Sequence, residues 1–219
     1  LQPMRALYLR MPAVATLVLA VGAGYLIGGT RSAVVVAALT LFIALSPWWD
    51  RALVTLYMAT FGVVISCIIG FTVGTICFQN KKSAAFMLGI CDIFQTFPSF
   101  VYLIPVMMLF GITDTSVLIA VIVYATIPAT RYTIEGLRSV PVGLHEAATM
   151  SGVNKFQRLT KIEFPLAFPH MMLGLNQTIV FALFMVIIGA FIGTEDLGQY
   201  ILKALSDKNG AGIGLTLGI

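Results

Sequence analysis

Long uncharged and mostly apolar runs alternate with short charged segments along this chain. Counted between charged residues, the runs cover 11–30, 32–49, 52–80, 93–113, 115–130 and 164–194, and a last one begins at Asn209. Most are as long as the roughly 17–25 residues that a helix needs to cross a bilayer core. The pattern predicts six complete membrane-spanning helices and the start of a seventh.

Charges and prolines mark where the fourth predicted span begins and bends. Lys81 and Lys82 form a natural interfacial boundary, so this helix is expected to start near Ala84. Pro98 and Pro105 lie inside the same span. Because proline removes a backbone donor and clashes with the preceding turn, each is expected to bend or break the helix.

Gly70 and Gly74 lie four residues apart in the third predicted span. Small residues at this spacing form a face against which a neighbouring helix can pack closely. We expect this face to serve helix packing.

The composition agrees with a membrane protein. Hydrophobic residues make up 59% of the 219 residues, charged residues only 10%, and the mean hydropathy is +0.98. These values are far from the balance of soluble domains. The net charge of +4 is explained by Lys and Arg kept in cytoplasmic loops, so it does not indicate a nucleic-acid partner. The three cysteines lie in apolar sequence, so neither a metal site nor a disulfide is expected.

The loop at residues 131–161 carries the densest group of basic side chains, namely Arg131, Arg138, Lys155, Arg158 and Lys161. The positive-inside rule places such a loop in the cytoplasm. Counting back through the spans places Lys81 and Lys82 on the same side.

Two short helices are predicted within this loop. The first covers 142–151, and Gly152 supplies a left-handed C-terminal cap. Asn154 caps the second, which is expected to run to about Phe164 and to stop before Pro165.

The second of these helices has two stripes. An apolar stripe and a basic stripe each recur every three residues, the first formed by Phe156, Leu159 and Ile162 and the second by Lys155, Arg158 and Lys161. From physical chemistry alone, an amphipathic loop lying on the membrane surface explains this pattern.

A more specific pattern runs through the loop. Glu146-Ala147-Ala148 is followed by Gly152, Ile162 and Pro165, with Phe164 where Leu is commoner. This spacing resembles the cytoplasmic EAA motif of ABC importer permeases. The resemblance implies an all-α integral membrane protein with the type I ABC importer transmembrane fold, about seven transmembrane helices in this sequence and cytoplasmic coupling helices. By the same resemblance, Glu146, Ala147, Ala148, Gly152, Ile162 and Pro165 dock on an ATP-binding subunit.

Two further stretches narrow the resemblance. Residues 92–105 with Phe110-Gly111, and residues 193–198 with the stretch 200–218, are similar to glycine betaine/proline/choline permeases. The implied function is ATP-driven import of a betaine-like quaternary ammonium osmolyte (glycine betaine, proline betaine, choline or carnitine). The alternatives are the same class of importer for trimethylamine oxide or another small solute, and an ion-coupled secondary transporter.

The resemblance also implies partners. We expect a homodimer of permease subunits in the bacterial cytoplasmic membrane, with two ATP-binding subunits and a periplasmic or lipid-anchored binding protein. The chain has no G-x-x-x-x-G-K-[ST] phosphate loop, so ATP and Mg belong on the partner, and no enzymatic activity or cofactor is expected here. Residues 1–47 are expected to be helices outside the core, and 48–219 the permease core, with the coupling loop at 131–165 and a truncated last helix.

Polar and aromatic side chains inside the spans are candidates for the translocation pathway: Gln95, Thr96, Phe97, Asn176 and Gln177. Amides in hydrocarbon are costly, so they should face protein or water. They either bond helix to helix or border the solute route. The aromatic group Phe94, Phe97, Phe100 and Tyr102 is either a packing seam or a set of ring faces for a quaternary ammonium.

Charged residues near the inner ends of the spans suggest local ion pairs. Asp92 can pair with Lys81 or Lys82, and Arg131, Glu135 and Arg138 have the spacing of an ion-pair ladder on one helix.

Overall fold

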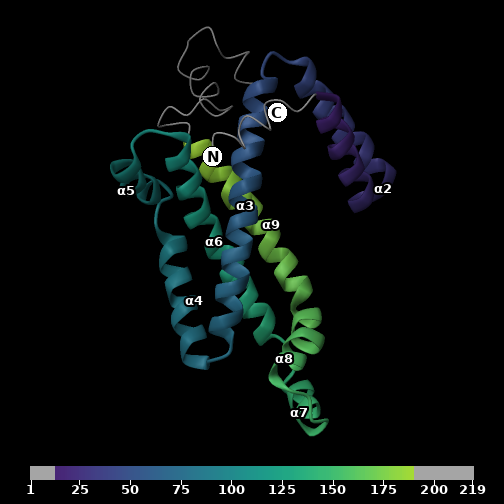
Figure 1. Cartoon of the computed structure of the whole chain (residues 1–219), viewed down its shortest axis with the longest axis vertical. Coiled ribbons are helices and arrows are strands. Elements are labelled where there is room, and N and C mark those ends of the chain that lie inside the picture. The colour runs from purple at the N-terminus through teal and green to yellow at the C-terminus, as the bar shows by residue number, and fades with distance from the viewer. Residues whose placement is uncertain (1–12, 190–219) are drawn as a thin grey trace. The chain divides into compact units, whose positions relative to one another are not determined.

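The computed structural model describes residues 13–189, and every regular element in that range is helical. The elements are α2 (Ala13–Leu45), α3 (Trp49–Phe78), α4 (Lys81–Thr96), α5 (Phe100–Phe110), α6 (Asp114–Arg138), α7 (Val142–Met150), α8 (Lys155–Arg158), the π-helical segment η1 (Leu159–Glu163) and α9 (Phe164–Gly189), as Figure 1 shows. The described residues fall into two compact units, 13–58 with 187–189 and 59–186, which are described separately.

In the first unit, α2 consists of two helical arms joined at Gly28 and Gly29. Both glycines have non-helical backbone angles, and Gly29 has a φ of 68°. A Cβ on Gly24 would lie 3.1 Å from the Val36 side chain, a contact that a straight helix does not allow across 12 positions. The arms therefore fold back on each other. Each is about 15 residues, or about 23 Å, long, which is short of a bilayer core of about 30 Å.

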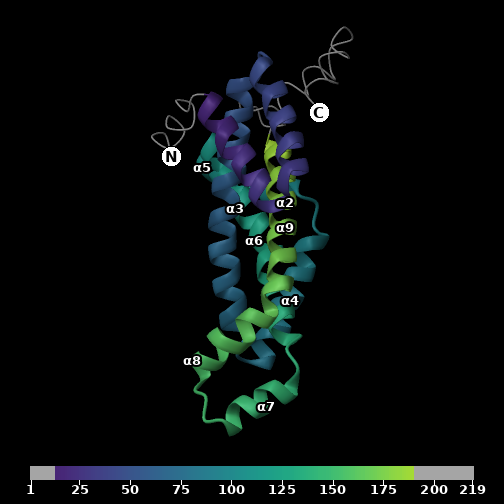
Figure 2. The same ribbon diagram turned by 90° about the vertical axis from the view of Figure 1, so that its right-hand side faces the viewer.

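In the second unit, α6 is the most buried long helix, and α3 and α9 pack against it (Figure 2). Close approach of α3 is made possible by Gly70 and Gly74, where an added Cβ would lie 2.4 Å from Ala129 and 2.7 Å from Thr133. The expectation that this pair of glycines forms a packing face is confirmed. Helix α9 approaches α6 equally closely at Gly174, where an added Cβ would lie 2.7 Å from the Tyr132 side chain.

A right-angled break separates α4 from α5. The two helix axes differ by 89° across residues 97–99. Phe97, the residue before Pro98, is extended with a ψ of 138°, as the ring of a following proline favours. The predicted break at Pro98 is confirmed. Pro105 does not break the chain, because it lies inside α5, which continues past it to Phe110.

The loop helices begin where the sequence predicts them. Helix α7 follows Pro141, and Gly152 has a φ of 72° after its end. Asn154 caps α8, with its side chain accepting a hydrogen bond from the Gln157 backbone N–H at 2.8 Å. The two helices lie at the same end of the second unit as the start of α4 (Figures 1 and 2).

The expected stop before Pro165 is wrong, because the helix continues through it. Segment η1 is π-helical, and the Phe164 N–H donates to the Leu159 carbonyl five residues earlier. This wider turn gives the proline ring room and does not require its missing N–H. Helix α9 then runs on to Gly189.

The count of spans differs from the prediction. By length and composition alone, the described residues contain four helices that could cross a membrane, or five if α4 and α5 form one broken span. Helix α2 is one of the four, although each of its two arms is shorter than a bilayer core. The runs at 11–30 and 32–49 are the arms of α2, and the run that begins at Asn209 lies outside the described residues.

Candidate functional site

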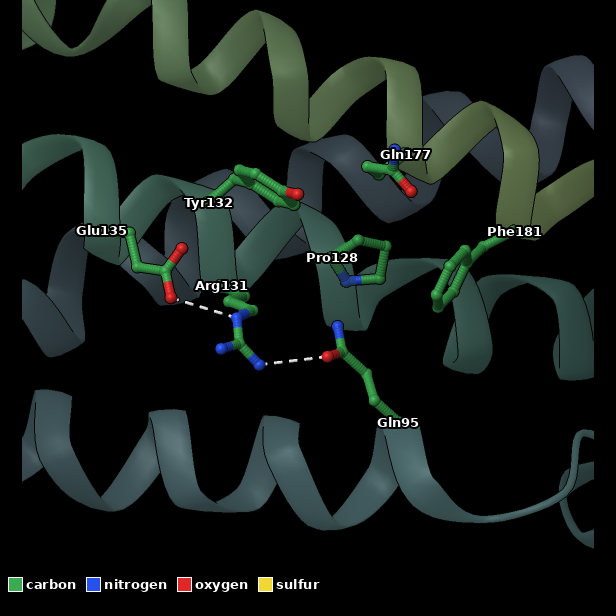
Figure 3. A pocket seen from close by; sticks show the side chains of 7 residues that line it. All are labelled: Gln95, Pro128, Arg131, Tyr132, Glu135, Gln177 and Phe181. Atoms are coloured by element: carbon green, nitrogen blue, oxygen red, sulfur yellow. Dashed lines mark hydrogen bonds and ion pairs between the residues drawn. The ribbon is translucent and has the colours of Figure 1, made fainter.

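A polar cavity of about 450 Å³ lies between α4, α6 and α9 of the second unit. Its lining residues are Gln95, Pro128, Arg131, Tyr132, Glu135, Gln177 and Phe181. Figure 3 shows Gln95 and Gln177 reaching toward the cavity from opposite sides, with Phe181 beside them. The cavity thus combines amide groups, charges and aromatic rings.

Arg131 is the centre of the polar network in this cavity. Its Nε donates to Glu135 at 3.0 Å, and its Nη1 donates to the Gln95 side-chain oxygen at 3.0 Å and to Asp92. The guanidinium therefore ties α6 to α4. The prediction that Asp92 pairs with Lys81 or Lys82 is wrong, because Asp92 lies on the face of α4 that meets Arg131.

The expected ion-pair ladder is half present. Arg131 and Glu135 pair as their spacing indicates. Arg138 instead donates from Nη2 to the Lys81 carbonyl at 3.2 Å, at the start of α4. This contact brings the end of α6 beside the boundary formed by Lys81 and Lys82.

The charged side chains that line the cavity balance each other. They are one guanidinium, Arg131, and one carboxylate, Glu135. Asp92 pairs with Arg131 from outside the lining. The rings of Tyr132 and Phe181 add electron-rich faces. A small solute with a methylated ammonium and a hydrogen-bond acceptor matches this lining chemically.

Only two of the five predicted pathway residues line the cavity. Gln95 and Gln177 do so. Thr96 is exposed and donates to the Ile93 carbonyl at 2.7 Å, Phe97 is 46% exposed after the end of α4, and Asn176 is exposed outside the lining.

Five of the lining residues were not among the predicted pathway residues. Four of them, Pro128, Arg131, Tyr132 and Glu135, have the spacing i, i+3, i+4, i+7, which places them on one face of α6. Gln177 and Phe181 have the spacing i, i+4 on α9. This helical periodicity was the signal that could have found them.

Part of the aromatic group, Phe94 and Tyr102, packs into a chain of rings that continues to Phe181. Phe94 meets Tyr102 at 5.9 Å between ring centroids, Tyr102 meets Tyr124 at 5.2 Å, and Tyr124 stacks on Phe181 at 4.8 Å. The Tyr102 hydroxyl donates to the Phe94 carbonyl. Of these four rings, Phe181 is the one that lines the cavity.

The residues of the EAA pattern lie mostly on the surface of the loop. Glu146, Ala147, Gly152 and Pro165 are exposed, Ile162 is half-buried in η1, and Ala148 is 5% exposed. Ala148 therefore packs α7 against the unit, while its neighbours lie on the surface.

Glu163 is the residue of the loop that sequence reasoning missed. Its side chain is 2% exposed, and its Oε1 lies 2.9 Å from Arg158 Nε and 3.1 Å from His145 Nδ1. A second hollow of about 380 Å³ adjoins the three residues. No sequence signal marks this burial, because it depends on a contact between residues 18 positions apart.

Metal ligation has little support in the described range. Residues 13–189 contain no group of three or more His, Cys, Asp or Glu side chains that could hold a metal ion. Their three cysteines are free, and Cys67 and Cys91 are buried.

Comparison with known proteins identifies the family. Residues 62–219 match the family described as binding-protein-dependent transport system inner membrane component. The chain belongs to this family of permeases. The resemblance carried by the EAA pattern is thereby confirmed.

Relatives within the permease family have named solutes. The chain is 90% identical over 219 residues, all of its length, to 30% of the trimethylamine N-oxide transport system permease protein TmoV of Pelagibacter ubique. It is 34% identical over 199 residues, 91% of its length, to 56% of the glycine betaine/proline betaine transport system permease protein ProW of Escherichia coli. The chain thus spans about a third to a half of the length of these permeases.

The fold also has a solved relative. A structure of the MetNI methionine ABC transporter in an inward-facing conformation matches with a TM-score of 0.65 and 20% identity, covering 82% of this chain and 89% of the matched chain. This likeness supports the permease fold.

Proposed function

We propose that this chain is part of the membrane subunit of an ATP-driven importer for trimethylamine N-oxide. The observation that carries the proposal is the 90% identity, over the whole chain, to the permease named for that solute in Pelagibacter ubique. Identity to the glycine betaine permease is only 34%. Trimethylamine oxide was the alternative in the sequence analysis, after betaine-like osmolytes, and the difference in identity favours it.

The cavity around Arg131 supports a role in the solute route. Trimethylamine N-oxide has a methylated, positively charged nitrogen and a negatively charged oxygen. The rings of Phe181 and Tyr132 suit the methylated nitrogen, and the amide N–H groups of Gln95 and Gln177 suit the oxygen. We assign these residues to the pathway and leave Thr96, Phe97 and Asn176 out of it.

The loop is proposed to receive force from an ATP-binding subunit. Glu146, Ala147 and Gly152 are exposed on or beside α7, as docking on another protein requires. Pro165 is exposed as well, whereas Ala148 is buried and Ile162 is half-buried and would support the loop. Residues 48–219 would form the permease core and 1–47 additional helices.

The proposed assembly pairs two permease subunits with two ATP-binding subunits, which hold ATP and Mg, and a periplasmic or lipid-anchored binding protein. Its place is the bacterial inner membrane. This chain contributes no catalytic residue, and hydrolysis occurs on the partner.

Reconstitution tests the function. The full-length permease is placed in liposomes with its ATP-binding subunit and binding protein, and uptake of radiolabelled trimethylamine N-oxide is measured with and without internal ATP. Uptake is expected only with ATP, and an excess of glycine betaine should compete weakly. Uptake driven by an ion gradient without ATP would overturn the importer, and preferred uptake of glycine betaine would overturn the solute.

A further inference from the structure

Glu163 is a buried carboxylate at the junction between the loop and α9. Its side chain is 2% exposed. A carboxylate withdrawn from water is costly unless charged or polar donors surround it. The conformation of this junction therefore depends on the partners of Glu163.

The partners of Glu163 come from two different segments. Arg158, the last residue of α8, donates from Nε at 2.9 Å. His145, on α7, has its Nδ1 3.1 Å from the same oxygen, Oε1. A histidine Nδ1–H donates to a carboxylate in the neutral or in the protonated ring. One oxygen atom thus joins α7 to α8.

The contact with His145 is the polar side-chain link from α7 to its surroundings in the described part of the chain. Other side-chain hydrogen bonds of this region stay local: Thr149 Oγ1 donates to the His145 carbonyl, and Ser151 Oγ to the Ala147 carbonyl. His145 also directly precedes Glu146, the first residue of the EAA pattern. A displacement of α7 by a docked protein therefore pulls on Glu163.

Glu163 is also continuous with the helix that lines the cavity. It ends η1, and α9 begins at the next residue. Arg158 bridges the five residues of the π turn and stiffens it. Gln177 and Phe181 lie further along α9, about 20–27 Å from Glu163 at about 1.5 Å per residue. A continuous helix thus connects the carboxylate to the cavity.

We propose that Glu163 is a positioning residue that transmits the movement of α7 to α9, an inference that rests on the importer function proposed above. Its carboxylate holds His145, beside the docking residues, while its backbone belongs to the start of α9. The path through this side chain bypasses the turn at residues 151–154. Without the carboxylate, α7 moves with the ATP-binding subunit but α9 follows less.

The test measures coupling in the reconstituted transporter, as trimethylamine N-oxide transported per ATP hydrolysed. Glu163→Ala and His145→Leu should each lower this ratio by about 5- to 150-fold, the range of a coupling free energy of about 1–3 kcal/mol. His145→Gln keeps a donor for the carboxylate and should retain most of the ratio. Lys161→Gln is the control, because it removes an exposed charge from the same segment.

A double mutant separates transmission from general support of the loop. If Glu163 and His145 act through one contact, the variant with both Glu163→Ala and His145→Leu loses no more than the worse single variant. If each residue only stabilises its own segment, the losses multiply. Should Glu163→Ala fail to assemble, the comparison of His145→Leu with His145→Gln decides the question, because His145 is only partly buried.

The outcomes distinguish this inference from the proposed function. A low ratio in His145→Leu with recovery in His145→Gln, and equal losses in the single and double variants, support transmission through Glu163. Ratios equal to that of the unmodified transporter in Glu163→Ala and His145→Leu, or multiplied losses, overturn it. An unmodified transporter that hydrolyses ATP without importing the solute refutes the proposed function instead.

Discussion

A methyl group on Gly70 of α3 would lie 2.4 Å from the side chain of Ala129 on α6, closer than two carbon atoms can come. At this point the surface of α3 lies directly on the backbone of α6, and the Thr130 amide nitrogen is 2.9 Å from the same position. The contact holds α6, and with it Arg131, in place.

Gly70→Ala is therefore expected to lower stability by about 1–3 kcal/mol through overpacking. Thermal unfolding of the purified permease in detergent measures the loss. Gly89→Ala, on α4, is the matched control, because an added Cβ meets nothing there within 4 Å. The control should be neutral or stabilising, since alanine favours a helix over glycine by about 0.5–1 kcal/mol. Equal loss in both variants would contradict the packing argument.

Uptake by Gly152 variants should decrease as the free-energy cost of the left-handed backbone at this position increases. The φ of 72° suits glycine, is tolerated by asparagine, and costs a β-branched residue about 1–2 kcal/mol or more. ATP-driven uptake should decrease from the unmodified protein to Gly152→Asn and further to Gly152→Val. Amounts of inserted protein should stay equal, because this residue lies in a loop. Uptake by Gly152→Val at the unmodified rate would rule out a role for this cap.

Loss of Arg131 should cost more stability than loss of Asp92. Arg131→Met removes the donor that Asp92, Gln95 and Glu135 share, whereas Asp92→Asn leaves the bonds to the other two. Since these groups are partly exposed, each contact is worth about 1 kcal/mol or less. Chemical unfolding of the two variants gives the comparison. A larger loss for Asp92→Asn would show that the guanidinium is not the centre of the network.

Gln177 and Asn176 are adjacent amides with different surroundings. Gln177 lines the cavity, and Asn176 is exposed outside its lining. Gln177→Leu should raise the KM of uptake for trimethylamine N-oxide by about 3- to 10-fold, the value of one hydrogen bond of about 0.5–1.5 kcal/mol. Asn176→Leu should leave the KM close to that of the unmodified protein. The reverse order would remove this cavity from the solute route.

The sequence was a good guide where local chemistry decides the backbone. Pro98 breaks the chain, and Gly152 takes the left-handed conformation. In both cases the residue type itself determines which dihedral angles are accessible. The spacing of Gly70 and Gly74 was equally informative, because close helix packing needs small residues at that interval. The start of α4 was placed less well, because the helix begins at Lys81, three residues before the expected start near Ala84.

Predictions from the sequence failed where a contact between residues distant in the chain determines the structure. Pro165 continues a helix because the preceding turn is π-helical, a geometry that no single residue signals. Asp92 pairs with Arg131, 39 positions away, and not with Lys81 or Lys82 as predicted. Glu163 is buried because α7 folds back over it. In the candidate site, Gln95 and Gln177 were predicted because amides stand out among apolar residues. The lining face of α6 was not predicted, because it is defined by the helices that pack around the cavity, α4 and α9.

The right-angled break between α4 and α5 also determines how many membrane crossings are counted in the second unit. Lys81 and Arg138 meet at one end, so the chain between them leaves that end and returns to it. Helix α6, which is about 37 Å long at about 1.5 Å per residue, brings the chain back to this end. Helices α4 and α5 together carry it away. In variants that carry a single exposed cysteine, a membrane-impermeant thiol reagent should therefore label Lys82→Cys and Lys161→Cys from the same side, and Gly111→Cys from the opposite side. Counting α5 as a crossing of its own would reverse the side assigned to every residue after it.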